Sequence, residues 1–214
     1  MIEIVRVNRR KPSPKDIRRA VEELKKNRLV IFPTETLYGI GGNALSKNAI
    51  RALIKAKKRT PGKGFIVLIN AKKSVKLFTK EISKDAKRLM DTFWPGPLTL
   101  IFKKRPSVPK LLTGGASTIA LRYTSHKVPQ ALIKGLGSPI TAPSANKSGN
   151  TPPEIARAAI ADFSDTLEVR LAFDSGRSKD KKPSTIVDVS QKKIHILRVG
   201  AISTSQVLKA LKGN

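Results

Sequence analysis

Residues 32–39, F-P-T-E-T-L-Y-G, place two hydroxyls, a carboxylate and a tyrosine directly after a short apolar run. Side chains of these types suit a small polar ligand, because they offer hydrogen-bond donors and acceptors beside a buried strand. Taken alone, the segment is more simply explained as a turn whose Thr and Glu side chains cap the next helix. It is a candidate binding segment that needs support from elsewhere in the chain.

A second candidate is the basic segment A-K-K-R-T-P-G-K-G at residues 56–64, which carries Lys57, Lys58, Arg59 and Lys63. Arginine offers a planar fork of N–H groups and lysine a compact charge, so together they can neutralise a triphosphate. Cations at the end of a helix also stabilise the helix dipole, which explains the cluster equally well. The spacing does not fit the phosphate-binding pattern G-x-x-x-x-G-K-[ST].

The third candidate is T-A-P-S-A-N-K-S-G at residues 141–149, where Ser, Asn and Gly follow a predicted strand. Backbone amides and hydroxyls in such a run could hold a phosphate or a ribose. The composition is also common in loops, which is the simpler explanation for this segment alone.

Other reactive residue types give little support for an active site. The chain has no Cys and two His, which excludes disulfides and a thiolate zinc site and argues against an imidazole-rich metal centre. Neither His126 nor His195 has an evident nucleophile as partner, so both are predicted to be structural or on the surface. Trp94, in F-W-P-G-P-L-T, is predicted to lie in the core or at a rigid corner.

Apolar spacing and capping residues predict an α/β fold. Helices are expected from Pro14 to Leu24 after the N-cap Ser13, from Ser46 to about residue 57, and over residues 83–93, 127–134, 153–161 and 203–212, the last opened by Ser203 and Gln206. Strands are expected over residues 2–7, 29–32, 65–69, 98–102, 118–122, 139–142, 169–173, 185–189 and 194–197, and loops over 34–43 and 174–183. Because helices separate some strands while others follow closely, the sheet should mix parallel and antiparallel pairs.

The composition predicts one globular domain over residues 1–214, since 39% of the residues are hydrophobic. No apolar run approaches the roughly 18 residues that span a bilayer, so we expect a soluble, cytoplasmic protein without membrane contact. The net charge of +28 should attract polyanions such as nucleic acid, although a solvated basic surface would give the same count. Without an RNA-reading motif, contact with RNA would rest on shape and phosphates.

Seven segments of the chain occur in one order at compact spacing. They are F-P-T-E-T-L-Y-G, K-K-R-T-P-G-K-G, W-P-G-P-L-T, I-A-L-R, A-P-S-A-N-K-S-G, P-S-T-I-V-D and I-L-R-V-G-A-I. Together they resemble the YrdC family of threonylcarbamoyl-AMP synthases, over about residues 14–202. The resemblance implies a single YrdC-like domain, in which a twisted mixed sheet with flanking helices encloses a large, basic, concave cleft.

The resemblance also implies two sets of site residues. ATP would be bound by Lys57, Arg59, Lys63, Thr118, Ser144, Asn146 and Arg198. Threonine would be bound by Thr36, Tyr38, Arg122, Ala142 and Ser184. The residue types fit this assignment, because the fork of Arg122 can pair with a carboxylate while the hydroxyls of Thr36 and Ser184 meet the other polar atoms.

Members of this family make threonylcarbamoyl-AMP and pyrophosphate from L-threonine, bicarbonate and ATP, for N6-threonylcarbamoyladenosine modification of tRNA. By resemblance we expect this chain to be such a nucleotidyltransferase, with Lys57 and Arg59 as catalytic residues that stabilise charge at the α-phosphorus. Mg²⁺ would arrive with ATP rather than at a metal site built by the protein. Contact with tRNA, or with the complex that performs the next step, is expected, and no oligomeric state is predicted.

Two positions depart from the pattern of the family. Leu68 stands where some members have a histidine, and Lys63 and Gly64 replace the N-P of that branch, so the chain matches the lysine-bearing branch better. At residues 122–124, R-Y-T replaces the usual R-x-P, which bears on the backbone of the threonine pocket.

Two other functions fit part of the sequence. A non-catalytic RNA-binding module would use the basic cleft on structured RNA, but it would not need Thr36, Arg122 and Ser184 beside the nucleotide motifs. A carbamoyl-adenylating domain of the hydrogenase-maturation type resembles this fold but sits beside cysteine-rich zinc modules, and this chain has no Cys. The synthase ranks first, the RNA-binding module second.

Overall fold

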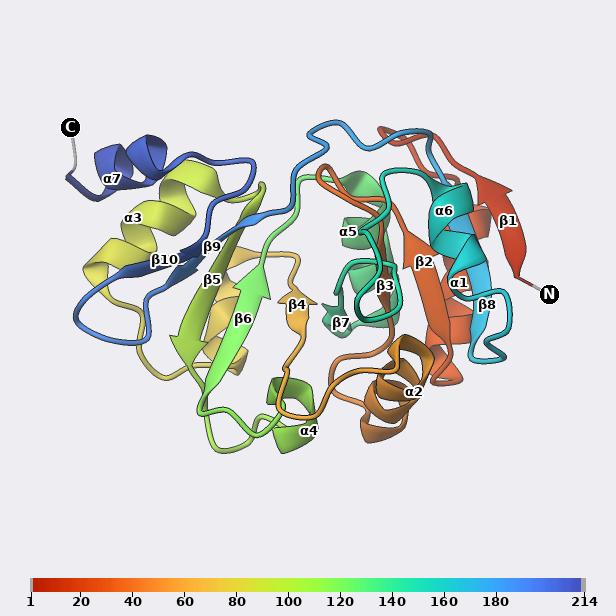
Figure 1. Ribbon diagram of the computed structural model, residues 1–214, viewed down its shortest axis with the longest axis horizontal. Helices are drawn as coiled ribbons and strands as arrows, with labels where there is room; N and C mark the ends of the chain where they lie inside the picture. Colours follow the sequence, from red (N-terminus) through yellow and green to blue (C-terminus); the bar gives the residue numbers. More distant parts are fainter. Residues whose placement is uncertain (1, 213–214) are drawn as a thin grey trace.

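The strands divide between two sheets. The computed structural model describes residues 2–212, and within this range the strand orders are β1-β8-β2-β3 and β10-β9-β5-β6-β4-β7. Figure 1 shows the two sheets side by side, with the four-stranded one in the half that contains the N-terminus. Both sheets mix parallel and antiparallel neighbours, so the predicted mixed pairing is confirmed.

The four-stranded sheet is formed by β1 (Glu3–Arg6), β8 (Val169–Asp174), β2 (Leu29–Phe32) and β3 (Gly39–Gly41). Strand β8 runs parallel to β1 and β2, and β3 returns antiparallel to β2. Every side chain of β2 is buried, because side chains alternate between the two faces of a strand and both faces are covered here.

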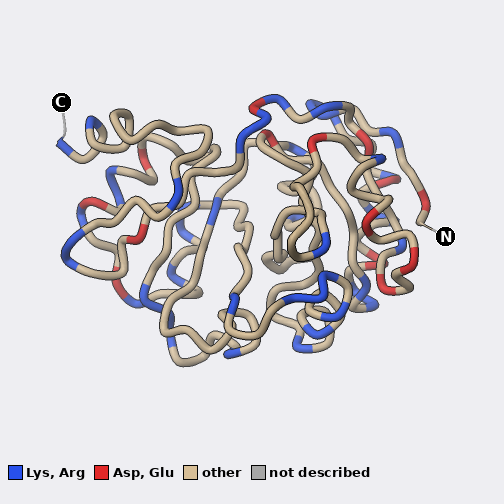
Figure 2. The backbone as a smooth tube through the Cα atoms, in the orientation of Figure 1, with Lys and Arg blue, Asp and Glu red and all other residues tan. Residues whose placement is uncertain are grey.

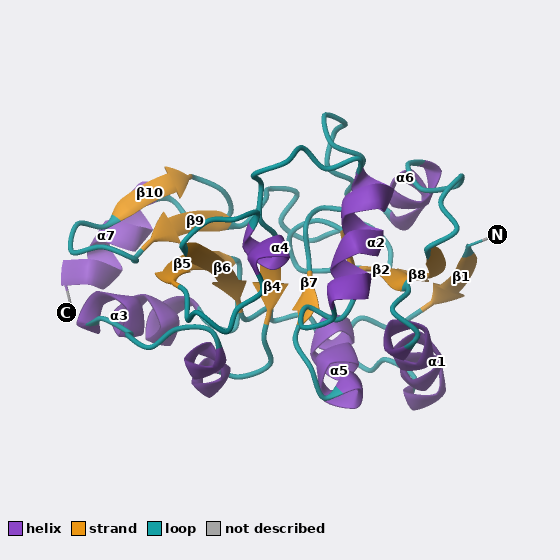
Figure 3. Ribbon diagram, turned by 90° about the horizontal axis from the view of Figure 1, so that it is seen from below, coloured by secondary structure: helices purple, strands orange, loops and turns teal. Residues whose placement is uncertain are grey.

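Two pairs of helices cover this sheet from opposite sides, as Figure 3 shows. They are α1 (Pro14–Lys25) with α5 (Lys127–Leu136), and α2 (Lys47–Lys57) with α6 (Ala156–Ala161). Val30 and Phe32 pack with the first pair, whereas Leu29 and Ile31 pack in the cluster that contains the second. Burying one such aliphatic or aromatic side chain contributes about 1.5–3 kcal/mol. The packing of its four side chains therefore stabilises β2 although the strand is short.

Helix α1 begins where the sequence predicts. The Ser13 side chain accepts a hydrogen bond from the backbone N–H of Asp16, and Pro14 occupies the first turn, where its missing N–H costs nothing. One face is buried against the sheet and α5, by Ile17, Ala20, Val21 and Leu24. Ser46 caps α2 in the same way, through the N–H of Ala49.

The six-stranded sheet is formed by β10 (His195–Arg198), β9 (Thr185–Asp188), β5 (Leu98–Lys103), β6 (Thr118–Arg122), β4 (Ile66–Leu68) and β7 (Ile140–Thr141). Helices α3 (Lys84–Phe93) and α7 (Thr204–Lys212) lie together on one side of it (Figure 3). Ser203 and Gln206 cap α7 reciprocally, as predicted. Trp94 is buried after α3, and its indole N–H donates to the carbonyl of Leu98 (2.7 Å), which confirms a core position.

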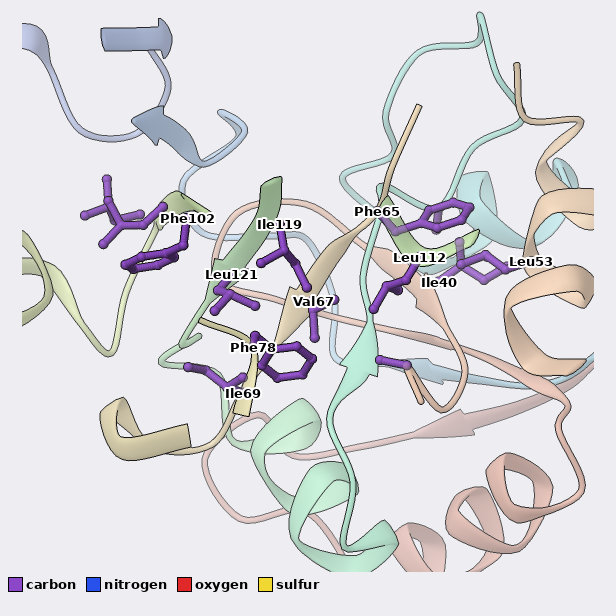
Figure 4. Packing of buried hydrophobic residues seen from close by; sticks show 14 of the residues in the cluster. Ile40, Leu53, Phe65, Val67, Ile69, Phe78, Phe102, Leu112, Ile119 and Leu121 are labelled. Carbon is purple, nitrogen blue, oxygen red and sulfur yellow. The ribbon is translucent and has the colours of Figure 1, made fainter. Parts of the chain in front are cut away.

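A continuous apolar core joins the two halves beneath the loops. Figure 4 shows Phe102, Leu121 and Val67 on the side of the six-stranded sheet. Phe65 and Leu112 lie between these strands and helix α2, and the backbone N–H of Phe65 donates to the carbonyl of Leu112 (3.0 Å). The short helix α4 (Lys110–Thr113) therefore packs next to α2, although α4 connects two strands of the six-stranded sheet and α2 covers the four-stranded one.

The sheets meet where β3 approaches β7. The backbone N–H of Thr141 donates to the carbonyl of Gly42 (3.0 Å), and isolated bridges join Gly39 to Ser144 and Asn43 to Ile140. A Cβ at Gly41 would lie 1.7 Å from the carbonyl oxygen of Thr141, so this close approach requires glycine. The joint places the loop after β2 next to the loop after β7.

Three elements differ from the expected ones. The segment predicted as a loop over 34–43 contains β3, which pairs through its backbone although glycines flank its single isoleucine. The short helices η1 (Lys72–Leu77) and α4 were not predicted, because one or two turns carry too little periodicity. Among residues 2–212, none of the helices has the length and apolarity required to cross a membrane.

Candidate active site

Two adjoining pockets lie near the joint, the smaller one between the sheets and the larger one against the six-stranded sheet. The smaller has a volume of about 80 Å³ and the larger about 350 Å³. They share a wall made of Ile66, Ser144 and Arg198. A ligand that filled both pockets would therefore pass Arg198 and Ser144 at the point where the pockets meet.

Arg122 lies in the wall of the smaller pocket at the end of β6. It is 5% exposed. Its Nη1 donates to Oγ1 of Thr36 (3.0 Å) and its Nε to the carbonyl of Gly96 (3.2 Å), while Nη2 lies 3.0 Å from Oε1 of Glu35. Within the described chain, Nη2 has no well-directed hydrogen bond despite this ion pair. A buried guanidinium that keeps N–H groups for a ligand suits a carboxylate.

The other residues predicted for threonine also line the smaller pocket, and they are Thr36, Tyr38, Ala142 and Ser184. The hydroxyl of Ser184 lies 2.8 Å from Oγ1 of Thr99 and accepts from Nη2 of Arg198 (3.1 Å). Leu68 adds an apolar surface to the same wall. The residues that the sequence predicts for threonine thus come from the sides of both sheets and lie around the smaller pocket.

The hydroxyl of Tyr38 is occupied by the segment that follows β8. Its Oη donates to the carbonyl of Gly176 (2.7 Å) and accepts from the backbone N–H of Ser175 (3.1 Å). Burial raises the pKa of the Tyr38 phenol, so it stays protonated and able to donate. The tyrosine anchors the polar segment 174–183, which crosses from one sheet to the other (Figure 1).

Four of the residues predicted for ATP line the larger pocket, namely Arg59, Thr118, Ser144 and Arg198. Nη2 of Arg59 donates to the carbonyl of Gly64 (2.5 Å), and its guanidinium carbon lies 4.9 Å from the centre of the Phe65 ring. These contacts orient the guanidinium at the pocket wall. Burial lowers the pKa of Arg59, but an arginine starts from so high a value that it remains charged.

Lys57, Lys63 and Asn146 lie outside the described lining of both pockets. Lys57 is 2% exposed, and its ammonium donates to the carbonyls of Ser144 (2.6 Å) and Asn146. Burial, with a smaller contribution from Arg59, lowers the pKa of Lys57 to about 7. These contacts make Lys57 a support for the loop that carries Ser144, and its expected contact with the nucleotide stays a prediction.

The side chain of Asn146 also faces its own loop, since Nδ2 donates to the carbonyls of Lys147 (3.0 Å) and Asn150 (2.7 Å). Lys63 is exposed at the surface. Figure 2 shows Lys and Arg around the end of α2 and along the segment 177–182, so positive charge lies on both sides of the joint. ATP contacts by Lys63 and Asn146 stay predictions.

The sequence suggested for Glu35 only the capping of the next helix, but Ser46 caps that helix. The structure places this carboxylate 9% exposed beside Arg122. Burial alone would raise the pKa of Glu35, but the Arg122 guanidinium and the Thr124 hydroxyl together hold it below its usual value. Its position between Thr34 and Thr36, in the candidate binding segment, could have marked Glu35 as a site residue. Nothing in the neighbouring sequence indicates that Arg122 is its partner.

The order of these segments along the chain is also that of a known family. A family model for the Sua5, YciO and YrdC proteins, described as telomere recombination, matches residues 22–200. The chain belongs to the Sua5/YciO/YrdC family. The match spans all the predicted site residues, from Thr36 to Arg198.

Several relatives within the Sua5/YciO/YrdC family carry names. The threonylcarbamoyl-AMP synthase of Pyrococcus abyssi is 36% identical over 195 residues, which are 91% of this chain and 57% of that protein. A putative threonylcarbamoyl-AMP synthase of Mycobacterium tuberculosis is 34% identical over 192 residues, 90% of this chain and 87% of that protein. The crystal structure of P. abyssi Sua5 complexed with L-threonine has a TM-score of 0.91 at 35% identity and covers 98% of this chain and 60% of that one.

This chain thus spans about three fifths of the length of the Pyrococcus protein and most of the Mycobacterium one. The fold shared with Sua5/YciO/YrdC structures confirms the predicted YrdC-like architecture. Among residues 2–212, no group of three His, Cys, Asp or Glu side chains is placed to hold a metal ion. Mg²⁺ stays a prediction tied to ATP.

The departure R-Y-T at 122–124 is accommodated at this site. Arg122 keeps its place in the pocket wall, and the carbonyl of Tyr123 accepts from the N–H of Gly96 (2.7 Å). Thr124 is fully buried, and its hydroxyl donates to Oε2 of Glu35. A proline could not make that contact, so the threonine adds a polar bridge between the two sheets.

Proposed function

We propose that this chain is an L-threonylcarbamoyladenylate synthase, a nucleotidyltransferase that makes threonylcarbamoyl-AMP and pyrophosphate from L-threonine, bicarbonate and ATP. The observation that carries the proposal is the buried Arg122, which keeps N–H groups for a ligand in a pocket that adjoins a larger, arginine-lined one. The names of the relatives, and the L-threonine in the Pyrococcus Sua5 structure, support the choice of substrate.

Threonine binds with its carboxylate on Arg122 and its other polar atoms near Thr36 and Ser184. Its amine, once deprotonated, attacks the carbon of bicarbonate-derived carbon dioxide, so that a C–N bond forms and the amine gives up a proton to solvent. The product is a carbamate, N-carboxythreonine. Because no protein base is needed for this step, positioning in the pocket is the main contribution of the chain.

The carbamate then faces the shared wall of the two pockets. Its oxygen attacks the α-phosphorus of ATP, an O–P bond forms, the bond to the β-phosphate oxygen breaks, and pyrophosphate leaves with the electron pair. Arg59 and Arg198 stabilise the charge that develops there. Lys57 acts from behind the wall by holding the Ser144 loop. Mg²⁺ bound with ATP would neutralise phosphate oxygens.

The test is pyrophosphate release from ATP, Mg²⁺ and bicarbonate, with L-threonine, L-serine, glycine or no amino acid. Wild type should release pyrophosphate and form an adenylate with threonine. Arg122→Ala and Arg59→Ala should lose at least about tenfold in rate, since each removes a charge-assisted contact. Arg88→Ala on α3 is the matched control, because Arg88 pairs with Asp85 outside both pockets. Threonine-independent release would contradict the proposal.

The product would serve tRNA modification, and the net charge of +28 favours contact with tRNA or with the complex that uses the adenylate. We place the activity in the cytoplasm, where ATP and tRNA are available. A non-catalytic RNA-binding module remains the second candidate, because the same charge supports it. The threonine dependence of the reaction separates the two.

A further inference from the structure

The Glu35 carboxylate joins the two sheets at the edge of the smaller pocket. Its backbone follows β2 of one sheet, while the described partners of its side chain lie at the end of β6 of the other sheet and in the three residues after it. Oε2 accepts from the hydroxyl of Thr124, and Oε1 accepts from the backbone N–H of Ser125 (3.2 Å) and lies 3.0 Å from Nη2 of Arg122. The carboxylate is thus satisfied by a segment of four residues.

The guanidinium of Arg122 is held on three sides. Thr36 and Gly96 accept from Nη1 and Nε, and Glu35 stands beside Nη2. Two of these partners are neutral oxygens, so Glu35 supplies the negative charge next to the guanidinium. A buried cation without such a partner would turn toward water or recruit it, because an unpaired buried charge is costly.

We propose that Glu35 is a positioning residue for substrate recognition, which holds the Arg122 guanidinium in the orientation that presents its remaining N–H groups to the carboxylate of the amino-acid substrate. The proposal rests on the proposed function, because it deepens the role of the same pocket. Glu35 itself does not line the pocket, so it acts through Arg122.

The ion pair leaves the guanidinium available to a ligand. The Glu35 oxygens already accept from Thr124 and Ser125, and the approach to Nη2 is not a well-directed hydrogen bond. Arginine has five N–H groups, and two of them are used by Thr36 and Gly96. A substrate carboxylate can therefore still take a two-pronged contact from Arg122.

The direction of the effect distinguishes orientation from charge. Removing the negative charge of Glu35 makes the pocket more positive, which by itself strengthens the binding of a carboxylate. Removing Glu35 as the partner that orients Arg122 instead weakens the binding of the carboxylate. Glu35→Gln keeps the size of the side chain but turns an N–H group toward another donor, so weaker threonine binding would identify orientation as the contribution of Glu35.

The experiment is titration calorimetry of L-threonine and L-threonine amide on wild type, Glu35→Gln, Arg122→Ala and the double variant. Glu35→Gln should weaken threonine binding about ten- to a hundredfold, the usual range for a charge-assisted contact. The loss should vanish in the Arg122→Ala background and for the amide, which lacks the carboxylate. The KM for ATP in pyrophosphate release should stay within about twofold of wild type, because Glu35 touches no residue of the larger pocket.

Glu168→Gln is the matched control. Glu168 pairs with Lys55 (2.7 Å) outside both pockets, so this variant should bind threonine like wild type. Thermal unfolding of each variant separates loss of fold from loss of binding, and Glu35→Asp, which keeps the charge on a shorter arm, should recover part of the affinity. Unchanged or tighter binding in Glu35→Gln, or losses that add in the double variant, would overturn the positioning role alone. Wild type that binds no threonine would overturn the proposed function itself.

Discussion

Arg122 and Lys57 are both buried cations, yet their surroundings give them different tasks. Arg122 lines a pocket and keeps N–H groups free of well-directed partners, whereas the ammonium of Lys57 is occupied by the carbonyls of Ser144 and Asn146. The backbone of Lys57 also accepts from the N–H of Ser148 (3.0 Å). In the proposed function Arg122 meets the substrate, whereas Lys57 shapes the loop that carries Ser144.

Lys57→Met should loosen this loop even in the absence of nucleotide. We expect amide hydrogen exchange at residues 144–148 to rise about tenfold or more, because local opening no longer breaks the two bonds from the ammonium. Lys55→Met on the same helix is the control, since Lys55 is exposed and reaches Glu168 instead. Equal exchange in wild type and Lys57→Met would contradict the supporting role.

His126 gives a prediction about pH. Burial lowers the pKa of His126 to about 4 from 6.5, with Glu35 opposing the shift and Arg9 adding to it. Its Nδ1 accepts from the N–H of Val128 (3.2 Å) as the cap of α5, a contact that a protonated ring cannot make. The predicted structural role of this histidine is confirmed.

The folded protein therefore resists protonating His126 while the unfolded chain takes up the proton below about pH 6.5. The free energy of unfolding should fall by roughly 1–3 kcal/mol as the pH drops from 6.5 to 4 because of this group. His126→Asn keeps a capping side chain and removes the titration. Urea unfolding at several pH values should show a shallower acid loss in the variant, and parallel curves would refute the assignment.

At the scale of elements, the site depends on the joint between β3 and β7. The segment 34–41 from one sheet and 141–144 from the other contribute to the same pocket, and backbone hydrogen bonds between them set their spacing. The segment 174–183 adds a second tie through Tyr38 and through the N–H of Asp180, which donates to the carbonyl of Glu35 (3.0 Å). Small changes of backbone volume at the joint should be costly.

Gly41→Ala should lower the free energy of unfolding by at least about 2 kcal/mol, because the new methyl group would collide with the backbone of Thr141 rather than with a movable side chain. Gly137→Ala is the comparison, since its Cβ meets nothing within 4 Å and its cost is that of a positive φ alone, about 1 kcal/mol. Chemical denaturation measures both. Equal costs would mean that the joint can relax.

At the scale of the whole molecule, the dominant feature is the excess of 43 Lys and Arg over 15 Asp and Glu. Such a field acts over several ångströms and recognises charge rather than sequence. The pockets, in contrast, use a few buried groups that salt screens weakly. Binding of a polyanion and binding of threonine should therefore respond differently to ionic strength.

We expect tRNA affinity to fall about tenfold or more between about 50 mM and about 200 mM salt, because releasing counterions into a more concentrated salt solution gains less entropy. Threonine affinity should change by less than about twofold over the same range. Fluorescence anisotropy with labelled tRNA and calorimetry with threonine provide the two measurements. A tRNA affinity that does not depend on salt would show that the basic surface does not bind phosphates.

The sequence by itself determined most of the elements and predicted residues that gather at two adjoining pockets. Caps such as Ser13 and Ser46, and the apolar spacing that follows them, act within a few residues, so their effect is legible without the fold. The ordered segments pointed to the family, and every residue predicted for threonine lines one pocket.

The tertiary structure alone decided how distant segments meet. Thr36 and Arg122 are 86 residues apart, Lys57 and Ser144 are 87 apart, and no local pattern states that either pair is in contact. The same holds for β3, which exists because β2 offers it a partner, and for Glu35, whose role depends on residues across the joint. Burial and backbone pairing between remote segments are collective properties of packing, and they alone place the ammonium of Lys57 against the carbonyl of Ser144.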